Sequence, residues 1–589
     1  MAPRGAARIG GPRVDRDFKR VNATRRCGAA GCALCAPTHK SYADPAARRL
    51  DVRVDMRTPM NRLQQEIARR RTFAIIAHPD AGKTTMTEKL LVLGGAINLA
   101  GAVKAKKAEK HATSDWMELE KQRGISVTTS VLRISWDDHE INLLDTPGHK
   151  DFSEDTYRTL SAVDSALMLI DAAKGVEPQT IKLMEVCRMR NTPIVTFMNK
   201  LDREGLDPFD LLDNVEKILN IACVPLTWPL GMGRSFRGIY DIRYKELHLF
   251  DPNNRSGAGD VIEVTGPDDP EIEKHVGPYI AAQLQEELEL VVGAGLDFDE
   301  EEFLAGRQTP VFFGSALSGF GVEEMFRSFV RYTPPPGARD AVERTVAPDE
   351  EAFSGFVFKI QANMDPKHRD RVAFMRVCSG RFERGHKTKL VRLGREVRVA
   401  NPIMFFAQDR EIIEEAWPGD IVGIHDTDLI EIGDTFTDGE VLHFRGVPSF
   451  APEIFRRVFL DNPLKVKNLR KGLEQLAQEG ATQLFVPRHS PDYIAGVVGQ
   501  LQLDVLLHRL RGEYDVQAHY ESVPYATARW YRCSDAAALS RFESALGQHL
   551  AVDVRKRPVF LAESMWRLNY TKEQHPKIEF FATSDGLNS

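Results

Sequence analysis

The hydrophobic pattern of residues 61–332 alternates short apolar runs with longer segments whose apolar residues recur at helical spacing. The runs at 72–77, 141–144, 193–198 and 310–314 are almost continuously apolar, which is typical of strands buried on both faces of a parallel sheet. Strands that alternate with amphipathic helices predict an α/β domain.

The pattern changes after residue 332. Three prolines and a charged stretch that ends at Glu351 predict a linker, and the short runs that follow, separated by turn residues, predict a small β-barrel. The remaining residues mix a helical segment (466–479) with strand-like ones (494–498) and predict an α+β domain. The expected domains are a disordered arm (1–60), an α/β domain (66–336) with an insertion (203–309), a β-barrel (350–448) and a C-terminal α+β domain (449–589).

The arm is basic, with 13 Lys and Arg against 5 Asp and Glu, and has too few large apolar residues to form a core. Cys27, Cys32 and Cys35, with His39, have a spacing that suits zinc or an iron–sulfur cluster. Two alternatives are a start site assigned too far upstream, which we favour, and a transit peptide, which the acidic residues of the arm argue against.

The composition narrows the function classes. No run approaches the roughly 18 apolar residues of a membrane helix, so a membrane protein is excluded. Seven cysteines in 589 residues do not form a disulfide scaffold, and they favour a reducing compartment, with the cytoplasm as the expected location. The formal charge of −6, from 78 Lys and Arg and 84 Asp and Glu, argues against indiscriminate binding to RNA.

The strongest chemical signal follows the run at 72–77. A glycine turn, a lysine and a hydroxyl residue at a helix start form a phosphate-binding loop, although Ala77 replaces the glycine of the generic pattern. Backbone N–H groups would surround the phosphates, the lysine ammonium would contact the β and γ phosphates, and a threonine hydroxyl would bind Mg²⁺. The loop residues are His78, Pro79, Asp80, Ala81, Gly82, Lys83, Thr84 and Thr85.

Three further motifs each follow the end of a predicted strand. The first supplies an acid for the Mg²⁺ shell and a glycine near the γ phosphate. The second supplies a carboxylate that accepts two hydrogen bonds from guanine, a pattern that adenine does not offer, and the third supplies backbone N–H groups for the guanine O6. The residues are Asp145, Gly148 and His149; Asn199, Lys200 and Asp202; and Ser315, Ala316 and Leu317.

The order and content of these motifs resemble the translational GTPases, since small signalling GTPases have a glutamine where His149 stands. Within that group the chain is most similar to the bacterial peptide chain release factor 3 family. The likeness spans about residues 60–575 and is carried by the segments 78–80, 121–126, 151–158, 359–371 and 526–530.

The resemblance implies roles for single residues. Ser126 occupies the position of a Mg²⁺-binding threonine, beside Thr84 and Asp145 as metal ligands. His149 is expected to orient the attacking water. Lys83, Asp80 and Gly148 are the other residues expected at the catalytic centre. In the family, ribosomal RNA moves this histidine into place, so hydrolysis by the protein alone should be slow.

The implied function is a ribosome-stimulated GTPase of translation termination that uses GTP, GDP and Mg²⁺ and promotes the dissociation and recycling of class I release factors. The ribosome is the expected partner, with no membrane association and a monomeric state. One alternative is a ribosomal GTPase similar to elongation factor G, which the short region after residue 448 disfavours. Another is an ATP-using P-loop enzyme, which Asp202 opposes. A scaffold that binds nucleotide without hydrolysing it is opposed by His149.

Overall fold

The computed structural model describes residues 60–95, 129–251, 258–293, 295, 297–362, 371–406, 409–426, 429–445 and 451–583. The predicted arm before residue 60, with Cys27, Cys32 and Cys35, lies outside the described residues, and so does Ser126. Residues 60–589 group as one unit, separate from residues 1–59.

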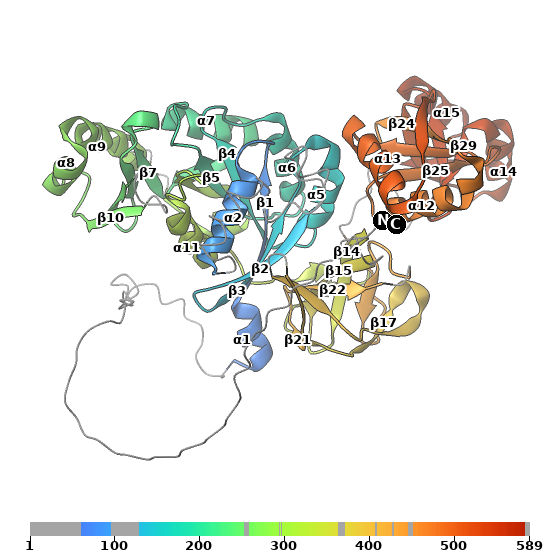
Figure 1. Cartoon of the computed structure of the whole chain (residues 1–589), viewed down its shortest axis with the longest axis horizontal. Helices are drawn as coiled ribbons and strands as arrows, with labels where there is room; N and C mark the ends of the chain where they lie inside the picture. Colours follow the sequence, from blue (N-terminus) through green and yellow to red (C-terminus); the bar gives the residue numbers. More distant parts are fainter. Residues whose placement is uncertain are drawn as a thin grey trace, which may run out of the picture. The chain divides into compact units, whose positions relative to one another are not determined.

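A seven-stranded sheet forms the centre of the α/β domain (Figure 1). Its order is β2-β3-β1-β4-β5-β11-β6, and β2 alone of these strands pairs antiparallel. Because β1, β3, β5 and β11 run parallel, the motifs that follow them meet at one edge of the sheet. The strands are β1 (Arg70–Ala77), β2 (Ser130–Trp136), β3 (His139–Asp145), β4 (Ser165–Asp171), β5 (Ile194–Asn199), β6 (Ala222–Pro225) and β11 (Gln308–Phe313).

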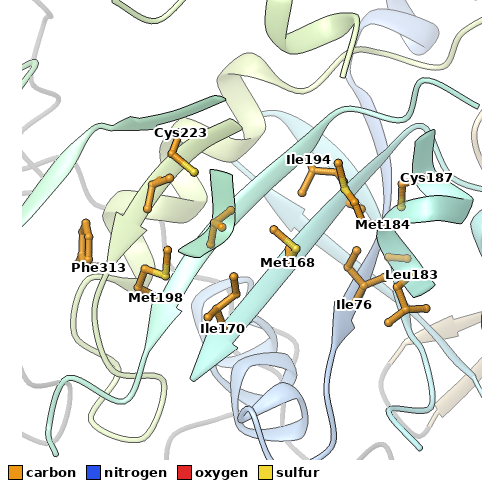
Figure 2. Packing of buried hydrophobic residues seen from close by; sticks show 14 of the residues in the cluster. Ile76, Met168, Ile170, Leu183, Met184, Cys187, Ile194, Met198, Cys223 and Phe313 are labelled. Atoms are coloured by element: carbon orange, nitrogen blue, oxygen red, sulfur yellow. The ribbon is translucent and has the colours of Figure 1, made fainter. Parts of the chain in front are cut away.

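Helices cover the sheet because its central strands are apolar on both faces; every residue of β4 is buried. Figure 2 shows Leu183, Met184 and Cys187 of one helix in the same buried cluster as Ile76 of β1 and Ile194 of β5. The helices are α1 (Arg62–Ala68), α2 (Lys83–Leu93), α5 (Ser153–Leu160), α6 (Pro178–Arg188), α7 (Pro208–Leu219) and α11 (Val322–Tyr332), with a short 3-10 turn η2 (Lys150–Phe152) before α5.

The predicted insertion supplies one strand to the main sheet and also forms a sheet of its own. Strand β6 pairs with β11, whereas four strands form a separate antiparallel sheet in the order β10-β9-β8-β7. The additional elements are β7 (Thr227–Leu230), β8 (Gly238–Asp241), β9 (Glu246–Phe250), β10 (Ala258–Glu263), α8 (Pro270–Val276), α9 (Pro278–Gly293) and α10 (Glu300–Leu304).

The segment expected to be a linker is ordered and partly buried. It forms a hairpin of β12 (Arg339–Asp340) and β13 (Thr345–Val346), and Arg339 is buried with its guanidinium 2.7 Å from Asp164 Oδ1. The prediction of a linker therefore missed a packed hairpin, because a buried ion pair with a distant residue leaves no local signal in the sequence.

A β-barrel-like domain follows the hairpin. Its eight-stranded sheet has the order β18-β17-β23-β14-β15-β22-β19-β20. Strands β16 and β21, which fall between β15 and β22 in the sequence, form a separate two-stranded sheet. The strands are β14 (Ser354–Ala362), β15 (Arg371–Ser379), β16 (Phe382–Glu383), β17 (Lys387–Leu390), β18 (Arg395–Arg398), β19 (Ile403–Phe406), β20 (Asp409–Ile412), β21 (Glu415–Ala416), β22 (Ile421–His425) and β23 (Thr435–Thr437).

The C-terminal domain is α+β, as predicted. One sheet of eight strands has the order β27-β24-β26-β25-β29-β30-β28-β31. Its elements are β24 (Ile454–Leu460), α12 (Val466–Gln478), β25 (Gln483–Pro487), β26 (Tyr493–Val497), α13 (Gln500–Tyr514), β27 (Ala518–Ser522), β28 (Thr527–Arg532), α14 (Ala536–Ala545), β29 (Leu550–Asp553), β30 (Pro558–Ala562), α15 (Met565–Gln574) and β31 (Glu579–Phe581). In the described part of the chain, no helix combines the length and apolar character needed to cross a membrane.

Buried ion pairs join the barrel to the α/β domain. Arg376 of β15 places Nη2 2.7 Å from Asp164 Oδ2, and Arg70 of β1 places Nε 2.9 Å from Asp420 Oδ2. All four side chains are almost fully buried. Each pair belongs to a larger group, since Asp164 also pairs with Arg339 and Arg70 also pairs with Glu66. A displacement of the two domains would separate buried charges, so these pairs specify how the domains meet.

Candidate nucleotide-binding site

The loop between β1 and α2 has the geometry of a phosphate cradle. Asp80 and Gly82 both have positive φ, of 66° and 99°, and the Ala81 N–H donates to His78 O at 3.2 Å. Helix α2 begins at Lys83 directly after the turn, so its unpaired N–H groups face the loop. A Cβ on Gly82 would lie 2.2 Å from Asn199 Nδ2, and for that reason the position requires glycine.

Asn199 joins three of the predicted motifs. Its Nδ2 donates to Ala81 O in the phosphate loop at 2.7 Å, and its Oδ1 accepts from the Lys200 and Ala316 N–H groups, both at 2.8 Å. The side chain is buried. Asn199 therefore fixes the spacing between the candidate phosphate and base segments.

Asp202 is oriented by Ser315, whose hydroxyl donates to Asp202 Oδ1 at 2.6 Å. The N–H groups of Ser315 and Ala316, predicted to bind guanine O6, are both used inside the protein: the first donates to Phe320 O at 3.0 Å and the second to Asn199. A guanine O6 that binds the Ala316 N–H would have to share it with Asn199 or displace that contact, whereas Leu317, the third predicted residue, also lines the pocket.

Lys83 and Asp145 lie in direct contact at the centre of the site and are both buried. Asp145 Oδ2 is buried and has no hydrogen-bond partner among the described residues, so it is suited to a water of a Mg²⁺ shell. The described residues hold no cluster of three or more His, Cys, Asp or Glu side chains arranged for a metal. A Mg²⁺ ion here would accordingly depend on the Thr84 hydroxyl, phosphate oxygens and water, a donor set that Mg²⁺ accepts.

His149 lies on the border of the same site, just before η2. Its Nδ1 accepts a hydrogen bond from the Asp151 N–H at 3.2 Å, and 31% of its side chain is exposed. The same Nδ1 lies 3.4 Å from Asp151 Oδ1, so this ring nitrogen faces Asp151. Gly148 passes close to the loop, since a Cβ there would lie 3.6 Å from Ala77 O and from the Pro79 backbone.

These segments surround one pocket of about 310 Å³. Three predicted residues, Ala81, Asp145 and Ser315, do not line it but bond to residues that do. The structure thus brings together all the predicted site residues that it describes. The predicted residues that line the pocket are His78, Pro79, Asp80, Gly82, Lys83, Thr84, Thr85, Gly148, His149, Asn199, Lys200, Asp202, Ala316 and Leu317.

Two contributors were missed by the sequence analysis. Arg203 lines the pocket beside Asp202, and Asp171 Oδ2 accepts from Lys200 Nζ at 2.8 Å while Lys200 also donates to Asp80 O. Burial alone would raise the pKa of Asp171, but the bonds from Lys200 and the Ala173 N–H lower it. Asp171 ends a buried strand, the same signal that identified Asp145, so it could have been found.

Comparison with protein families gives three matches in succession along the chain. Residues 68–335 match the elongation factor Tu GTP binding domain, and residues 352–439 match elongation factor G domain 2. Residues 444–572 match the C-terminal domain of class II release factor RF3. The three matches correspond to the α/β domain, the barrel and the C-terminal domain.

A crystal structure of a protein from Thermus thermophilus has a similar fold, with a TM-score of 0.62. The match covers 79% of this chain and 71% of the other at 24% sequence identity. At that identity the likeness shows the fold alone, whereas the three family matches are matches of the amino-acid sequence. The order of an elongation-factor GTP-binding domain, a domain 2 and an RF3 C-terminal domain shows that the chain belongs to the class II release factors of the RF3 type among the translational GTPases.

Proposed function

We propose that this protein is a ribosome-stimulated GTPase of translation termination that promotes the dissociation and recycling of class I peptide chain release factors. One observation supports the proposal: the loop with positive φ at Asp80 and Gly82 and the Asp202 carboxylate line one pocket, in a chain whose residues 444–572 match the RF3 C-terminal domain. The proposed location is the cytoplasm, where terminating ribosomes are found.

The pocket would bind GTP or GDP from two sides. The N–H groups of the loop and of the first turn of α2 would surround the phosphates, and Lys83 would exchange its contact with Asp145 for the β and γ phosphates. Asp202, held by Ser315, would accept the two guanine hydrogen bonds. Adenine lacks these donors and would leave the carboxylate unpaired, at a cost that discriminates strongly.

His149 would position the attacking water through Nε2, because its Nδ1 is occupied by the Asp151 N–H. Asp80 and Gly148 would complete the surroundings of the γ phosphate. Bound Mg²⁺, held by Thr84 and through Asp145, would supply positive charge to the phosphate oxygens. With 31% of its side chain exposed, His149 is accessible to a partner that holds it against the phosphate, and the ribosome is the proposed partner.

The deciding experiment measures how fast a labelled class I release factor leaves post-termination ribosomes when this protein is added with GTP, GDP or ATP. Acceleration confined to GTP is the expected result. Acceleration with ATP as well would contradict the assignment of Asp202 as the guanine carboxylate and would favour the ATP-using alternative.

A second function is supported by the match of the barrel to elongation factor G domain 2. On that proposal the protein hydrolyses GTP on the ribosome but performs another step of translation. It predicts ribosome-stimulated release of phosphate with no change in the departure of the release factor. The same assay therefore separates the two functions when phosphate release is recorded in parallel.

A further inference from the structure

A buried lysine of the barrel contacts the α/β domain across the interface between the two domains. Lys359, on β14, is 2% exposed, and its ammonium donates to Thr129 O. The same Nζ lies 3.7 Å from Asp155 Oδ2 on α5. Asp155 Oδ2 in turn accepts from Thr129 N at 2.8 Å and from Thr129 Oγ1 at 2.7 Å.

This cluster connects two segments that matter for the nucleotide. Thr129 follows Ser126, the predicted Mg²⁺ ligand, by three positions, and Asp155 follows His149 by six. Burial alone would raise the pKa of Asp155, but Lys359, Arg158 and the Thr129 hydrogen bonds lower it. The carboxylate is therefore ionised near neutral pH and needs its cation.

We propose that Lys359 is a positioning residue for GTP hydrolysis: from the barrel, it holds Thr129, directly before β2, and helix α5 in one fixed relation. The inference rests on the proposed GTPase activity and adds a residue outside the nucleotide pocket. Lys359 acts through Thr129 and Asp155 and touches neither the nucleotide nor the attacking water.

The physical reason is the cost of leaving buried polar groups unpaired. Without the ammonium, the buried charge of Asp155 keeps only the Thr129 hydrogen bonds and the more distant Arg158, whose Nη2 lies 3.8 Å from Asp155 Oδ1, and the Thr129 carbonyl loses a donor. Both segments then gain alternative positions, so the arrangement competent for hydrolysis becomes a smaller fraction of the bound population. Nucleotide binding should change little, because Asn199, Asp202 and Lys83 are not in this cluster.

The test compares Lys359→Met with Arg376→Met in the full chain. Arg376 is a matched control, since it is also a buried cation of the barrel that reaches across the same interface. Its partner Asp164 retains the ion pair with Arg339 and lies on neither segment of the cluster. The readouts are kcat and KM for ribosome-stimulated GTP hydrolysis, GDP affinity and the thermal unfolding midpoint.

Lys359→Met is expected to lower the stimulated kcat about tenfold, a coupling of ordinary size, with GDP affinity unchanged. Arg376→Met is expected to keep kcat within about twofold of the wild type. A Lys359→Met variant with wild-type kcat, or equal losses in both variants, would overturn the proposal, because the second result would mean that any weakening of the interface suffices.

If Lys359→Met does not fold, Thr129→Val decides the question. It removes the hydroxyl bonds to Asp155 and to Thr159, both on α5, and leaves the backbone bond to Asp155. A fall in kcat of about threefold is expected, and an unchanged kcat would overturn the proposal. A wild-type chain that ribosomes do not stimulate would refute the proposed function itself, a result distinct from these, and Lys359 would then have no hydrolysis to position.

Discussion

Replacement of Gly82 by alanine is expected to weaken the binding of guanine nucleotide, because two costs fall on one residue. At φ 99°, a side chain costs about 1–2 kcal/mol of conformational strain. The new Cβ would also lie 2.2 Å from Asn199 Nδ2. Asn199 would have to move and would lose its bonds to Ala81 and Ala316, at about 0.5–1.5 kcal/mol each.

Only the second cost concerns the nucleotide, since the Asn199 bonds hold the phosphate loop against the base segment. Two lost bonds amount to about 1–3 kcal/mol, which sets the upper limit of the loss in GDP affinity at about 5- to 150-fold. The assay is equilibrium binding of fluorescent GDP to the full chain, with thermal unfolding recorded in parallel.

Gly433→Ala provides the control. Gly433 has nearly the same φ, 91°, but a Cβ there meets no atom within 4 Å, and it lies in the barrel. It should lose a similar amount of stability to strain while binding GDP normally. Wild-type GDP affinity in Gly82→Ala would refute the reasoning, and so would an equal loss of affinity in Gly433→Ala.

Three further predictions concern single side chains. His149→Ala should abolish ribosome-stimulated phosphate release and leave GDP binding intact; near-normal turnover would remove His149 from the mechanism. Asp202→Asn should weaken GDP about 10²-fold or more in competition binding, because the guanine donors lose their acceptor; equal affinity would show that the base binds elsewhere. Burial lowers the pKa of His248, but Glu324 and Glu246 outweigh burial and raise the pKa above 6.5. The protonated ring therefore stabilises the folded state fully below about pH 6.5, and this contribution to the free energy of unfolding is lost as the pH rises through the pKa of the folded state. His248→Gln should flatten that part of the curve of unfolding free energy against pH, and an unchanged slope would contradict the assignment.

The sequence predicted the parts of the site that follow from local rules. Lys83 begins a helix after a glycine turn. Asp145, Asn199 and Phe313 are the last residues of three strands that run parallel. Parallel strands bring their carboxyl ends to one edge, so order along the chain was enough to predict that the motifs meet. The same rules predicted the barrel-like and C-terminal domains from the spacing of apolar runs.

The parts that were not predicted depend on contacts between distant residues. Whether the Ala316 N–H faces the base or Asn199 is decided by packing, and the sequence contains no sign of it. Arg339 is charged and lies in a Pro-rich stretch, which is typical of a linker, yet it is buried because Asp164 compensates its charge. Lys359 belongs to the same class, since a lysine in an apolar strand predicts nothing until Asp155 is placed beside it.

The residues that follow His149 contact the C-terminal domain, and this contact bears on how the RF3-type domain meets the GTPase centre. Asp151 Oδ2 accepts from the Leu501 N–H at 2.8 Å and so caps the first turn of α13. The approach is so close that a Cβ on Gly499 would lie 1.9 Å from Asp151 Cγ. The backbone N–H of Asp151 binds the His149 ring while its carboxylate binds α13, so a shift of this residue alters both contacts together. The GTP-binding domain matches an elongation-factor family and the C-terminal domain matches RF3. The RF3-type domain therefore contacts the GTP-binding domain at Asp151, which follows the candidate catalytic histidine by only two positions in the chain.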